Sequence, residues 1–510
     1  MPDILICSFD AKYIHASLGA RCLLANLGGM RSRAGLAEFD LTCRAVEAVD
    51  AILAARPRIV GIGVYIWNVD LVTEVAELLL RIRSDIILVV GGPEVSHEME
   101  QQRICAVADY VVAGEGEQSF AWLCGEILRG GRPEGRVIRR KAAEPVELAM
   151  PYREYVEKDV RQRVIYVEAS RGCPFGCEFC LSSVDERVRE FPLTLFLDEM
   201  NRLMKKGVRQ FKFVDRTFNL NKERAEAVLD FFLDRQVPGL FLHFEMIPGR
   251  FPESLRARLR RFPRGMVQLE VGVQTLNPDV ADRIGRRMDV PVVEENLSFL
   301  RRETGVHVHA DLVAGLPGET WESFGEGFDR LVRLKPHEIQ IELLKKLRGA
   351  PIRRHDEVWR MIYNPQPPYE VLQTRDMDFP MLQRLRRFSR TWDLLANSGN
   401  FVESHELLWK DGGSPFAAFL NWSEWLRRQA GRGHGIALLQ LMEFYFCYLT
   451  REIGRVPGEV GPALFRDYAR GGRSDKPLFL HSFAEERTCE KASRRRGAQR
   501  QERHAAGFKI

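Results

Sequence analysis

The feature that most constrains this fold is a repeated alternation between short apolar runs and longer amphipathic runs. Five β-rich runs, each followed by an amphipathic segment, occupy residues 4–9, 41–44, 59–66, 86–90 and 110–112. Apolar strands that alternate with helices form parallel sheets, which helices cover on both faces. The first 140 residues therefore predict an α/β domain that resembles the flavodoxin-like doubly wound fold, whose ligands bind beyond the carboxyl ends of the strands.

A second series of strand and helix patterns follows. Its apolar strands are expected at residues 164–169, 210–214, 240–246, 266–273, 306–313 and 338–344, with helical patterns such as 193–206, 222–235 and 321–334 between them. Six units are fewer than the eight of a closed TIM barrel, so the pattern predicts a partial (β/α)6 barrel. Beyond Gly349 the alternation stops, and helical patterns rich in Trp, Phe and Arg take over.

These patterns divide the chain into five segments. We expect a ligand-binding α/β domain at 1–140, a barrel at 164–348 and a mainly helical domain at 349–484. The polar, proline-containing stretch 141–163 shows little periodicity and is expected to be a linker. The basic segment 485–510 is expected to be a disordered tail.

Composition excludes several classes of protein. The formal net charge is +5, and Cys489–Ile510 alone holds seven Lys or Arg against two Glu, so the rest is neutral and nucleic acid is not an expected partner. No apolar run approaches the roughly 18 residues of a membrane span, so no membrane partner is expected, and Met1 leads directly into a strand pattern rather than a signal peptide. Seven of the ten cysteines are scattered singly. The sequence therefore indicates a cytoplasmic protein with unpaired thiols.

The other three cysteines form a CxxxCxxC motif directly after the first barrel strand, at Cys173, Cys177 and Cys180. Thiolates are soft ligands that suit iron-sulfur chemistry. A structural zinc site or an ordinary electron-transfer cluster needs four protein ligands, whereas three leave one iron open to a substrate or cofactor. The alternative is a zinc knuckle that a distant histidine completes, and the candidates are His243, His307 and His309.

The cysteine motif resembles the signature of the radical S-adenosylmethionine (SAM) superfamily, which has an aromatic residue, here Phe179, before the last cysteine. The resemblance implies a 4Fe-4S cluster whose open iron chelates SAM. One electron, from a donor such as flavodoxin or ferredoxin, then cleaves SAM to methionine and a 5′-deoxyadenosyl radical.

Further barrel positions resemble the SAM-contacting motifs of that superfamily. The resemblance implies that SAM contacts Phe179 and five residues near strand ends, namely Asp215, Glu270, Gln274, Arg286 and Gly315. Glu270 or Gln274 would bind the ribose hydroxyls, and Arg286 would pair with the carboxylate of SAM. Asp215 stands where the superfamily often has a glycine-rich motif with a glutamate. The alternative for Asp215, Glu270 and Asp311 is that they cap loops.

A doubly wound domain ahead of such a barrel resembles the cobalamin-binding subclass. Its loops are matched by Gly91-Gly92-Pro93 and by Gly114-Glu115, and Tyr65 is a candidate to cover the corrin or the nucleotide. The DxHxxG motif of cobalamin mutases is absent. His15 is a candidate lower ligand of cobalt, and the alternative is a surface or capping role.

The resemblance implies a cobalamin-dependent radical SAM enzyme that methylates an unactivated carbon of a small-molecule substrate. The alternatives are a radical cyclisation or rearrangement enzyme, a cobalamin-binding sensor with a non-catalytic barrel, and a zinc-stabilised scaffold. The region 349–484 resembles the helical extension of uncharacterised proteins of this kind. The sequence assigns no catalytic residue and no substrate, because class-level resemblance does not identify a small molecule.

Overall fold

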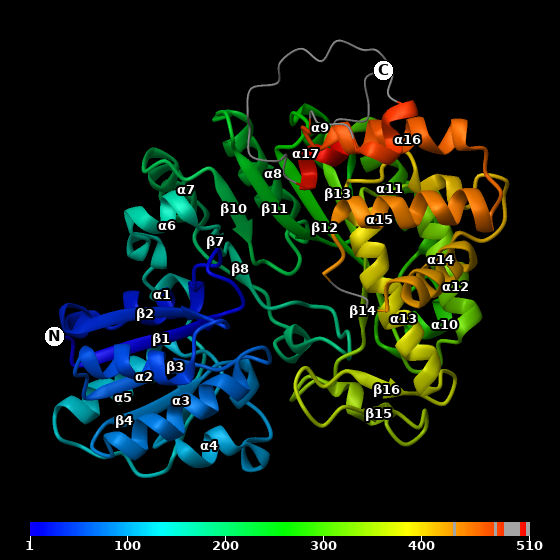
Figure 1. Cartoon of the computed structure of the whole chain (residues 1–510). Coiled ribbons are helices and arrows are strands. Elements are labelled where there is room, and N and C mark those ends of the chain that lie inside the picture. Colours follow the sequence, from blue (N-terminus) through cyan, green and yellow to red (C-terminus); the bar gives the residue numbers. More distant parts are fainter. Residues whose placement is uncertain (432–434, 474–476, 484–499, 506–510) are drawn as a thin grey trace. The chain divides into compact units, whose positions relative to one another are not determined.

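The computed structural model describes residues 1–431, 435–473, 477–483 and 500–505 of the 510-residue chain (Figure 1). The chain divides into two compact units. Unit 1 comprises Met1–Glu245, Lys345–Arg354 and Tyr363–Glu370. Unit 2 comprises Met246–Leu344, His355–Ile362 and Val371–Ile510. Unit 1 thus extends beyond the α/β domain expected at 1–140, and the predicted boundary at 348 falls inside one of its segments.

A six-stranded parallel sheet forms the N-terminal part of unit 1, in the order β2-β1-β3-β4-β5-β6. The strands are β1 (Ile4–Asp10), β2 (Ala34–Asp40), β3 (Ile59–Gly63), β4 (Ile87–Gly91), β5 (Tyr110–Val112) and β6 (Val137–Ile138). The order reverses at β1, as in doubly wound folds, and the predicted fold class is confirmed. The second strand lies at 34–40 rather than at 41–44, because it is a half-buried edge strand whose apolar pattern is weak.

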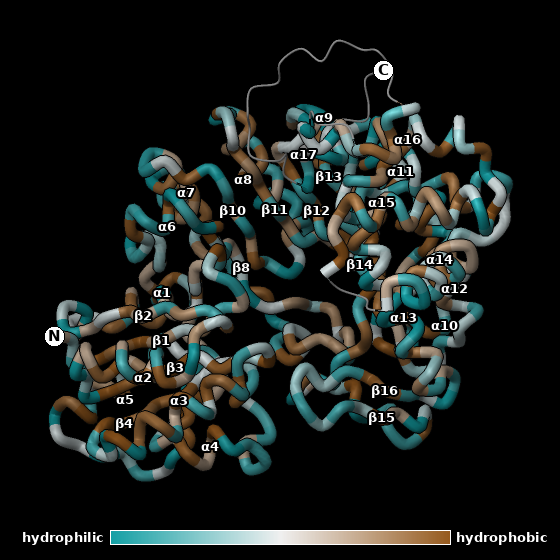
Figure 2. Tube along the Cα trace, viewed as in Figure 1, coloured by the Kyte–Doolittle hydropathy of each residue, from teal (hydrophilic) through white to brown (hydrophobic). Residues whose placement is uncertain are grey.

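Each face of this sheet has its own apolar core, because alternate residues of a strand point to opposite faces. Leu5, Cys7 and Phe9 of β1 pack on one face. Ile4 and Ile6 pack on the other. The first core lies under α2 (Ala45–Ala54), α3 (Val69–Ile82) and α4 (Arg103–Val107), and the second under α1 (Leu18–Ala25) and α5 (Glu117–Leu128). Figure 2 shows these strands in mainly hydrophobic colours.

The segment expected to be a linker is folded. It forms short 3₁₀ helices at Pro145–Glu147 and Pro151–Glu154 and the helix α6 (Glu157–Gln162). Tyr152 is buried, and its hydroxyl bonds both the amide and the carbonyl of Glu168 at 3.0 Å. Asp159 forms a 2.8 Å ion pair with buried Arg21 of α1. The hydrophobic periodicity of this segment is low because it contains no long helix or strand. Side-chain contacts, rather than regular secondary structure, hold it in place.

Three strands of the second series lie in unit 1, namely β7 (Ile165–Val167), β10 (Gln210–Phe213) and β11 (Phe241–Met246), whose last residue begins unit 2. They run parallel, and β10 pairs with both β7 and β11. The intervening helices are α7 (Leu193–Lys205) and α8 (Lys222–Leu233). A small antiparallel pair, β8 (Ser170–Arg171) with β9 (Arg189–Glu190), brackets the three cysteines.

Unit 2 contains the remaining strands of the series, β12 (Val267–Gln274), β13 (His307–Ala314) and β14 (Glu338–Leu343), which are also parallel. Its helices here are α9 (Glu253–Arg261), α10 (Pro278–Arg283), α11 (Val290–Glu303) and α12 (Trp321–Arg333). All six predicted strands are therefore present.

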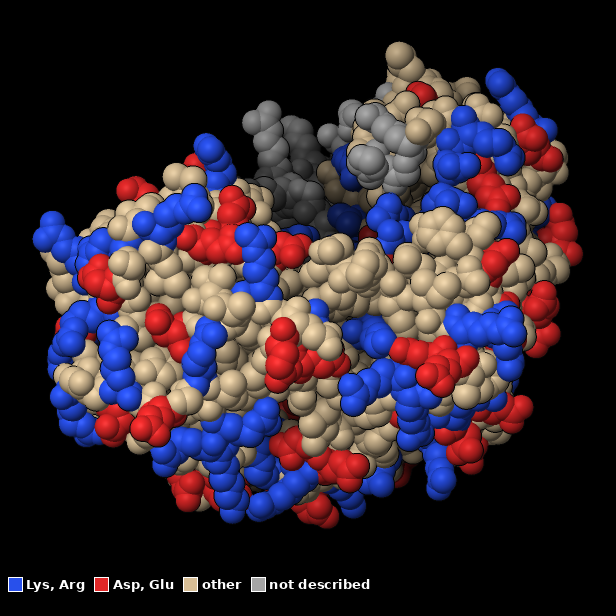
Figure 3. All heavy atoms as spheres, turned by 90° about the horizontal axis from the view of Figure 1, so that it is seen from below, with Lys and Arg blue, Asp and Glu red and all other residues tan. Residues whose placement is uncertain are grey.

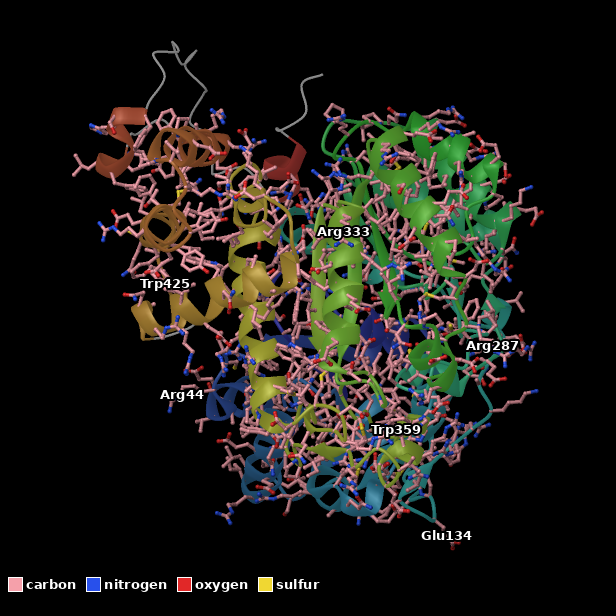
Figure 4. All side chains as sticks on the ribbon, turned by 90° about the vertical axis from the view of Figure 1, so that its right-hand side faces the viewer. Arg44, Glu134, Arg287, Arg333, Trp359 and Trp425 are labelled. Carbon is pink, nitrogen blue, oxygen red and sulfur yellow. The ribbon has the colours of Figure 1, made fainter. Side chains whose placement is uncertain are left out.

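Trp359, which Figure 4 labels, packs under the guanidinium groups of Arg283 and Arg375 at 4.3 and 3.9 Å from its ring centroid.

The C-terminal part of unit 2 is mainly helical, as expected. The short strand β16 (Val371–Gln373) precedes α13 (Phe379–Trp392), α14 (Pro415–Ala430), α15 (Leu438–Cys447) and α16 (Pro457–Arg470), whereas β15 (Ile362–Tyr363) begins in unit 2 and ends in unit 1. Its core is aromatic, with Phe388 and Trp392 of α13 against Phe416 and Phe419 of α14.

The expectation of a disordered tail at 485–510 is wrong for Arg500–Ala505, which forms the helix α17. Arg500 anchors α17, because its side chain donates to Asn397 O and pairs with Asp393 and Glu338. The rest of the predicted tail lies outside the described residues.

Among the described residues, no helix has the length and apolarity that a bilayer span requires. On the face in Figure 3, basic and acidic side chains are interspersed.

Candidate cofactor site

A cavity of about 530 Å³ lies in unit 1 at the carboxyl ends of β1, β3, β4 and β5. Ligands of doubly wound folds bind at this edge of the sheet, where the strand order reverses. Residues next to the cysteines, including Glu168, Arg171, Gly172 and Ser182, line the same cavity. Six of the seven predicted cobalamin residues also line it: Tyr65, Gly91, Gly92, Pro93, Gly114 and Glu115.

Gly92 is a position that only glycine fits. Its φ is +113°, and a Cβ there would lie 2.6 Å from the carbonyl oxygen of Val64. The loops after β3 and β4 approach this closely because the Val64 amide donates to Gly91 O at 2.7 Å. The absence of a side chain at Gly92 therefore lets the loops after β3 and β4 pack closely at the cavity wall.

Ser96 joins two loops of the cavity. Its hydroxyl donates to Gly92 O at 2.8 Å and accepts from the Gly114 amide at 3.0 Å. The loops after β4 and β5 are thus fixed to each other without a ligand. Sequence reasoning missed this serine, because its role depends on two glycines that tertiary structure brings together.

Tyr65 lines the cavity, whereas the candidate cobalt ligand His15 does not. The Tyr65 and Trp67 rings stack with centroids 4.5 Å apart, and burial raises the pKa of Tyr65 to about 12. His15 lines a separate cavity of about 280 Å³, and its Nδ1 bonds the Tyr166 hydroxyl at 2.7 Å. The bridge between His15 and Val164 holds it there, so the structure does not bring His15 to the other predicted cobalamin residues.

A buried charge network connects the loop after β5 to the residues beside the cysteines. Arg171 pairs with Glu115 at 3.3 Å, Glu117 at 2.7 Å and Glu168 at 2.9 Å, and its side chain is 12% exposed. Arg189 of β9 also pairs with Glu115. Burial raises the pKa of Glu168 to about 7, although Arg171 acts in the opposite direction.

The three cysteines lie on one loop between β8 and β9. The loop begins at Gly172, where a Cβ would lie 2.3 Å from Arg187 O. The Cys173 amide donates to Asp185 O and the Cys180 amide to Cys177 O, both at 3.0 Å. Cys177 is 5% exposed, and the other two cysteines are partly exposed. These soft donors on one loop fit an iron-sulfur cluster.

In the described part of the chain, no three His, Cys, Asp or Glu side chains gather closely enough to hold a single metal ion. A 4Fe-4S cluster binds each cysteine through a different iron, so its ligands lie farther apart than those of one ion. The absence of a single-ion site among the described residues therefore does not test the cluster assignment. The three cysteines remain the predicted ligands.

Asp215 follows β10 and lies directly behind the cysteine loop. One carboxylate oxygen accepts from the Ala169 amide at 3.0 Å and the other from the Ser170 hydroxyl at 2.6 Å. The carboxylate is 2% exposed, and burial raises its pKa. These bonds match the loop-capping alternative for Asp215, and its contact with SAM stays a prediction.

Four other predicted SAM residues belong to unit 2, at or near the carboxyl ends of its strands. Gln274 ends β12 with a φ of +71°, where the register shifts after Gly272. The Arg286 guanidinium donates to Gly272 O, so Arg286 and Gln274 meet at that glycine. Glu270 lies on β12, and Gly315 follows β13. Phe179 lies in unit 1 beside Cys180. The roles of these five residues stay predictions.

Comparison with family models matches nearly the whole chain in three parts. Residues 6–123 match the B12 binding domain, and residues 167–331 match the Radical SAM superfamily. Residues 357–506 match a family described as Protein of unknown function (DUF4080).

Curated relatives and solved structures match more distantly. An uncharacterized methyltransferase of Pyrococcus horikoshii, PH0819, is 27% identical over 56% of this chain and 66% of its own length. The cobalamin-dependent radical SAM methyltransferase TokK of Streptomyces tokunonensis is 22% identical over 61% of this chain and 50% of its own length. The chain therefore spans about half to two thirds of the length of these two relatives.

Among solved structures, the cobalamin-dependent SAM radical enzyme OxsB with aqua-cobalamin bound has a TM-score of 0.63. It is 14% identical, over 92% of this chain and 79% of its own, so this likeness shows the fold alone. The doubly wound sheet lies in the region that matches the B12 binding domain, and the cysteine loop lies in the region that matches the Radical SAM superfamily. The chain therefore carries a domain of the Radical SAM superfamily at residues 167–331, preceded by a B12 binding domain at residues 6–123.

Proposed function

We propose that this protein is a cobalamin-dependent radical SAM enzyme that methylates an unactivated carbon of a small molecule. One observation carries the proposal. A single cavity of unit 1 is lined both by the glycine loops of the B12-binding domain and by Gly172 and Ser182, which flank the cysteines. A cofactor in this cavity therefore contacts the segment that carries the predicted cluster ligands.

When bound, the cluster with SAM supplies a 5′-deoxyadenosyl radical, and cobalamin supplies the methyl group. The contribution of the chain is to bind, orient and exclude water. Gly91, Gly92 and Gly114 would contact cobalamin in the cavity that they line, and Tyr65 lies at the wall of the same cavity. Glu115 and Glu117 hold Arg171, and thereby the start of the cysteine loop, in a fixed place.

The match to the Radical SAM superfamily supports the SAM contacts that the sequence predicts. The cluster is held by Cys173, Cys177 and Cys180, and Phe179 directly precedes Cys180 in the sequence. Glu270 or Gln274 binds the ribose hydroxyls, and Arg286 pairs with the carboxylate of SAM, because a guanidinium matches a carboxylate. The remaining proposed SAM contacts are Gly315, which follows β13, and Asp215, which accepts from Ala169 and Ser170.

The names of the relatives support methyl transfer as the reaction. PH0819 and TokK are both described as methyltransferases. A one-electron donor such as flavodoxin or ferredoxin would reduce the cluster. Seven of the ten cysteines are scattered singly along the sequence, which supports a reducing compartment, and we propose the cytoplasm.

The test is to reconstitute the protein without oxygen and supply SAM and a strong reductant, with and without cobalamin. Mass spectrometry then quantifies 5′-deoxyadenosine and S-adenosylhomocysteine. We expect 5′-deoxyadenosine, together with S-adenosylhomocysteine that depends on cobalamin. The first product without the second would favour cyclisation or rearrangement. Cobalamin binding by a protein that holds no iron-sulfur cluster would favour the sensor and overturn the proposal.

A further inference from the structure

Residues 345–354 follow the last strand of the series, yet they belong to unit 1 with the cavity and the cysteine loop. This segment contacts two loops that are far apart in the sequence. One is the loop after β4, which continues from Gly92 and Pro93 into Glu94 and Glu98. The other is the cysteine loop.

At the first loop, the contact is a buried charge cluster around Glu94. Arg348 Nε lies 2.9 Å from Glu94 Oε1, and its Nη1 lies 3.2 Å from Glu98. The Tyr369 hydroxyl donates to the same Glu94 oxygen at 2.6 Å. Glu94 is 4% exposed and comes two residues after Gly92. Because a buried carboxylate needs a partner, Arg348 fixes this end of the cavity wall.

The backbone of the segment also packs on this loop. Gly349 has a φ of +83°, and a Cβ there would lie 2.4 Å from the ring of His97. No side chain fits at that position without moving the segment or the loop. The contact with the loop after β4 is therefore close packing as well as charge.

At the second loop, the contact is Glu178, which lies between Cys177 and Phe179 and is 3% exposed. The guanidinium of Arg354 pairs with its carboxylate. The Ile352 amide donates to its carbonyl oxygen at 2.8 Å. Both the side chain and the backbone of Glu178 are thus held by the segment that also holds Glu94.

We infer that residues 345–354 form a tether that couples the cobalamin loop to the cysteine loop, with Arg348 and Arg354 as positioning residues. The inference rests on the proposed function for the identity of the two cofactors. A tether of this kind is reciprocal, because ligand binding at either loop favours the same position of the segment. It would fix the position of the cobalamin loop relative to the predicted cluster ligands.

The test uses Arg354→Ala in the full chain, because Arg354 contacts the cysteine loop and is not part of the cavity lining. Cobalamin affinity is measured by absorbance titration of the cluster-loaded protein. We expect binding at least about fivefold weaker than in the wild type, the lower end of typical coupling between sites. Arg354→Lys keeps the positive charge and should restore most of the affinity.

Arg103→Ala is the matched control. Arg103 pairs with Glu77 on the surface of unit 1, to which Arg354 also belongs, and the Arg103 side chain is 75% exposed. It should leave cobalamin affinity unchanged. The double variant Arg354→Ala with Glu178→Gln should lose no more cobalamin affinity than the weaker-binding of the two single variants. Both changes remove the same ion pair, so their effects should not add.

A second readout needs no cofactor. Amide hydrogen exchange of residues 92–98 should be faster in Arg354→Ala than in the wild type, because the tether is released at its far end. Unchanged exchange and unchanged cobalamin affinity in folded Arg354→Ala would overturn the tether and leave the proposed function standing. Failure of the wild type to bind cobalamin would overturn the proposed function, while faster exchange at 92–98 would still support the tether.

Discussion

The loop after β4 and the loop of the three cysteines lie in one unit, but different forces hold them. Around Gly91 and Gly92 the first is fixed by hydrogen bonds to its backbone, from Val64 N to Gly91 O at 2.7 Å and from the Ser96 hydroxyl to Gly92 O, and charge enters only beyond them, at Glu94 and Glu98. The second is anchored mainly by charge, through Arg171 and Arg189 at its ends and Arg354 at Glu178. Hydrogen bonds to the backbone therefore hold the cavity wall at Gly91 and Gly92, whereas ion pairs hold much of the cysteine loop.

The difference follows from where each loop begins. The loop after β4 continues a strand that is buried on both sides, so the sheet sets its direction. The cysteine loop leaves the two-residue strand β8 and returns at β9, which gives the backbone little support. Thiolate ligands supply the missing constraint when a cluster binds, since metal binding contributes to folding. The four predictions below test this contrast, from the largest expected effect to the smallest.

Loss of a cluster ligand should have the largest effect and should remain local to the cysteine loop. Cys177→Ala should abolish SAM cleavage and lower the iron content, while cobalamin still binds the cavity that the sheet preforms. Iron and sulfide analysis, 5′-deoxyadenosine formation and cobalamin absorbance measure the three quantities. Cys447→Ala, which removes a thiol outside the motif, is the control. Full cleavage by Cys177→Ala would refute the cluster assignment.

Gly92→Leu should have the opposite pattern and spare the cluster. The added Cβ would clash with Val64 O, so Gly92→Leu should block cobalamin binding. Absorbance titration measures the affinity. Gly130→Ala separates strain from clash, because Gly130 also has a positive φ of +89° but no atom within 4 Å of its Cβ. Unaltered cobalamin uptake by Gly92→Leu would remove Gly92 from the site.

Arg171→Ala should show how far charge supports the cysteine loop. Removal of one partner of a buried ion pair costs about 3–5 kcal/mol, because the carboxylates of Glu115, Glu117 and Glu168 lose a shared cation. Urea unfolding monitors this loss. Arg129→Ala, which breaks an exposed pair with Glu126, should cost less than about 1 kcal/mol. Equal effects of the two changes would show that the buried network does not stabilise the unit.

Glu168→Gln should have the smallest effect, and pH should reveal it. Burial raises the pKa of Glu168 from its ordinary 4.5 to about 7, so the folded state favours the protonated form. The stability that protonation contributes is complete below pH 4.5 and is lost as the pH rises through 7. Between pH 5 and 8 the wild type should therefore lose roughly 2 kcal/mol relative to the variant. Parallel urea unfolding curves at both pH values would contradict this shift.

Local patterns predicted most of the architecture because strands and helices have short, distinct periods. The prediction of secondary structure was wrong for a strand that is only half-buried and for segments that side-chain contacts hold in place. Strand β2 is an edge strand, so the 41–44 pattern misplaced it. The expected linker is folded by Tyr152 and Asp159, and α17 is anchored by Arg500. Each of these contacts joins residues that are distant in sequence.

The sequence by itself determined the order of the domains, the three cysteines on one loop and the glycine pair after β4, because these depend on neighbours in the chain. Only the tertiary structure decided which side chains share the cavity. It placed His15 elsewhere, joined Gly92 to Gly114 through Ser96, and brought Arg348 and Arg354 to the two loops. The physical reason is that ion pairs and hydrogen bonds between distant residues form wherever folding brings charges together, and no local pattern records their partners.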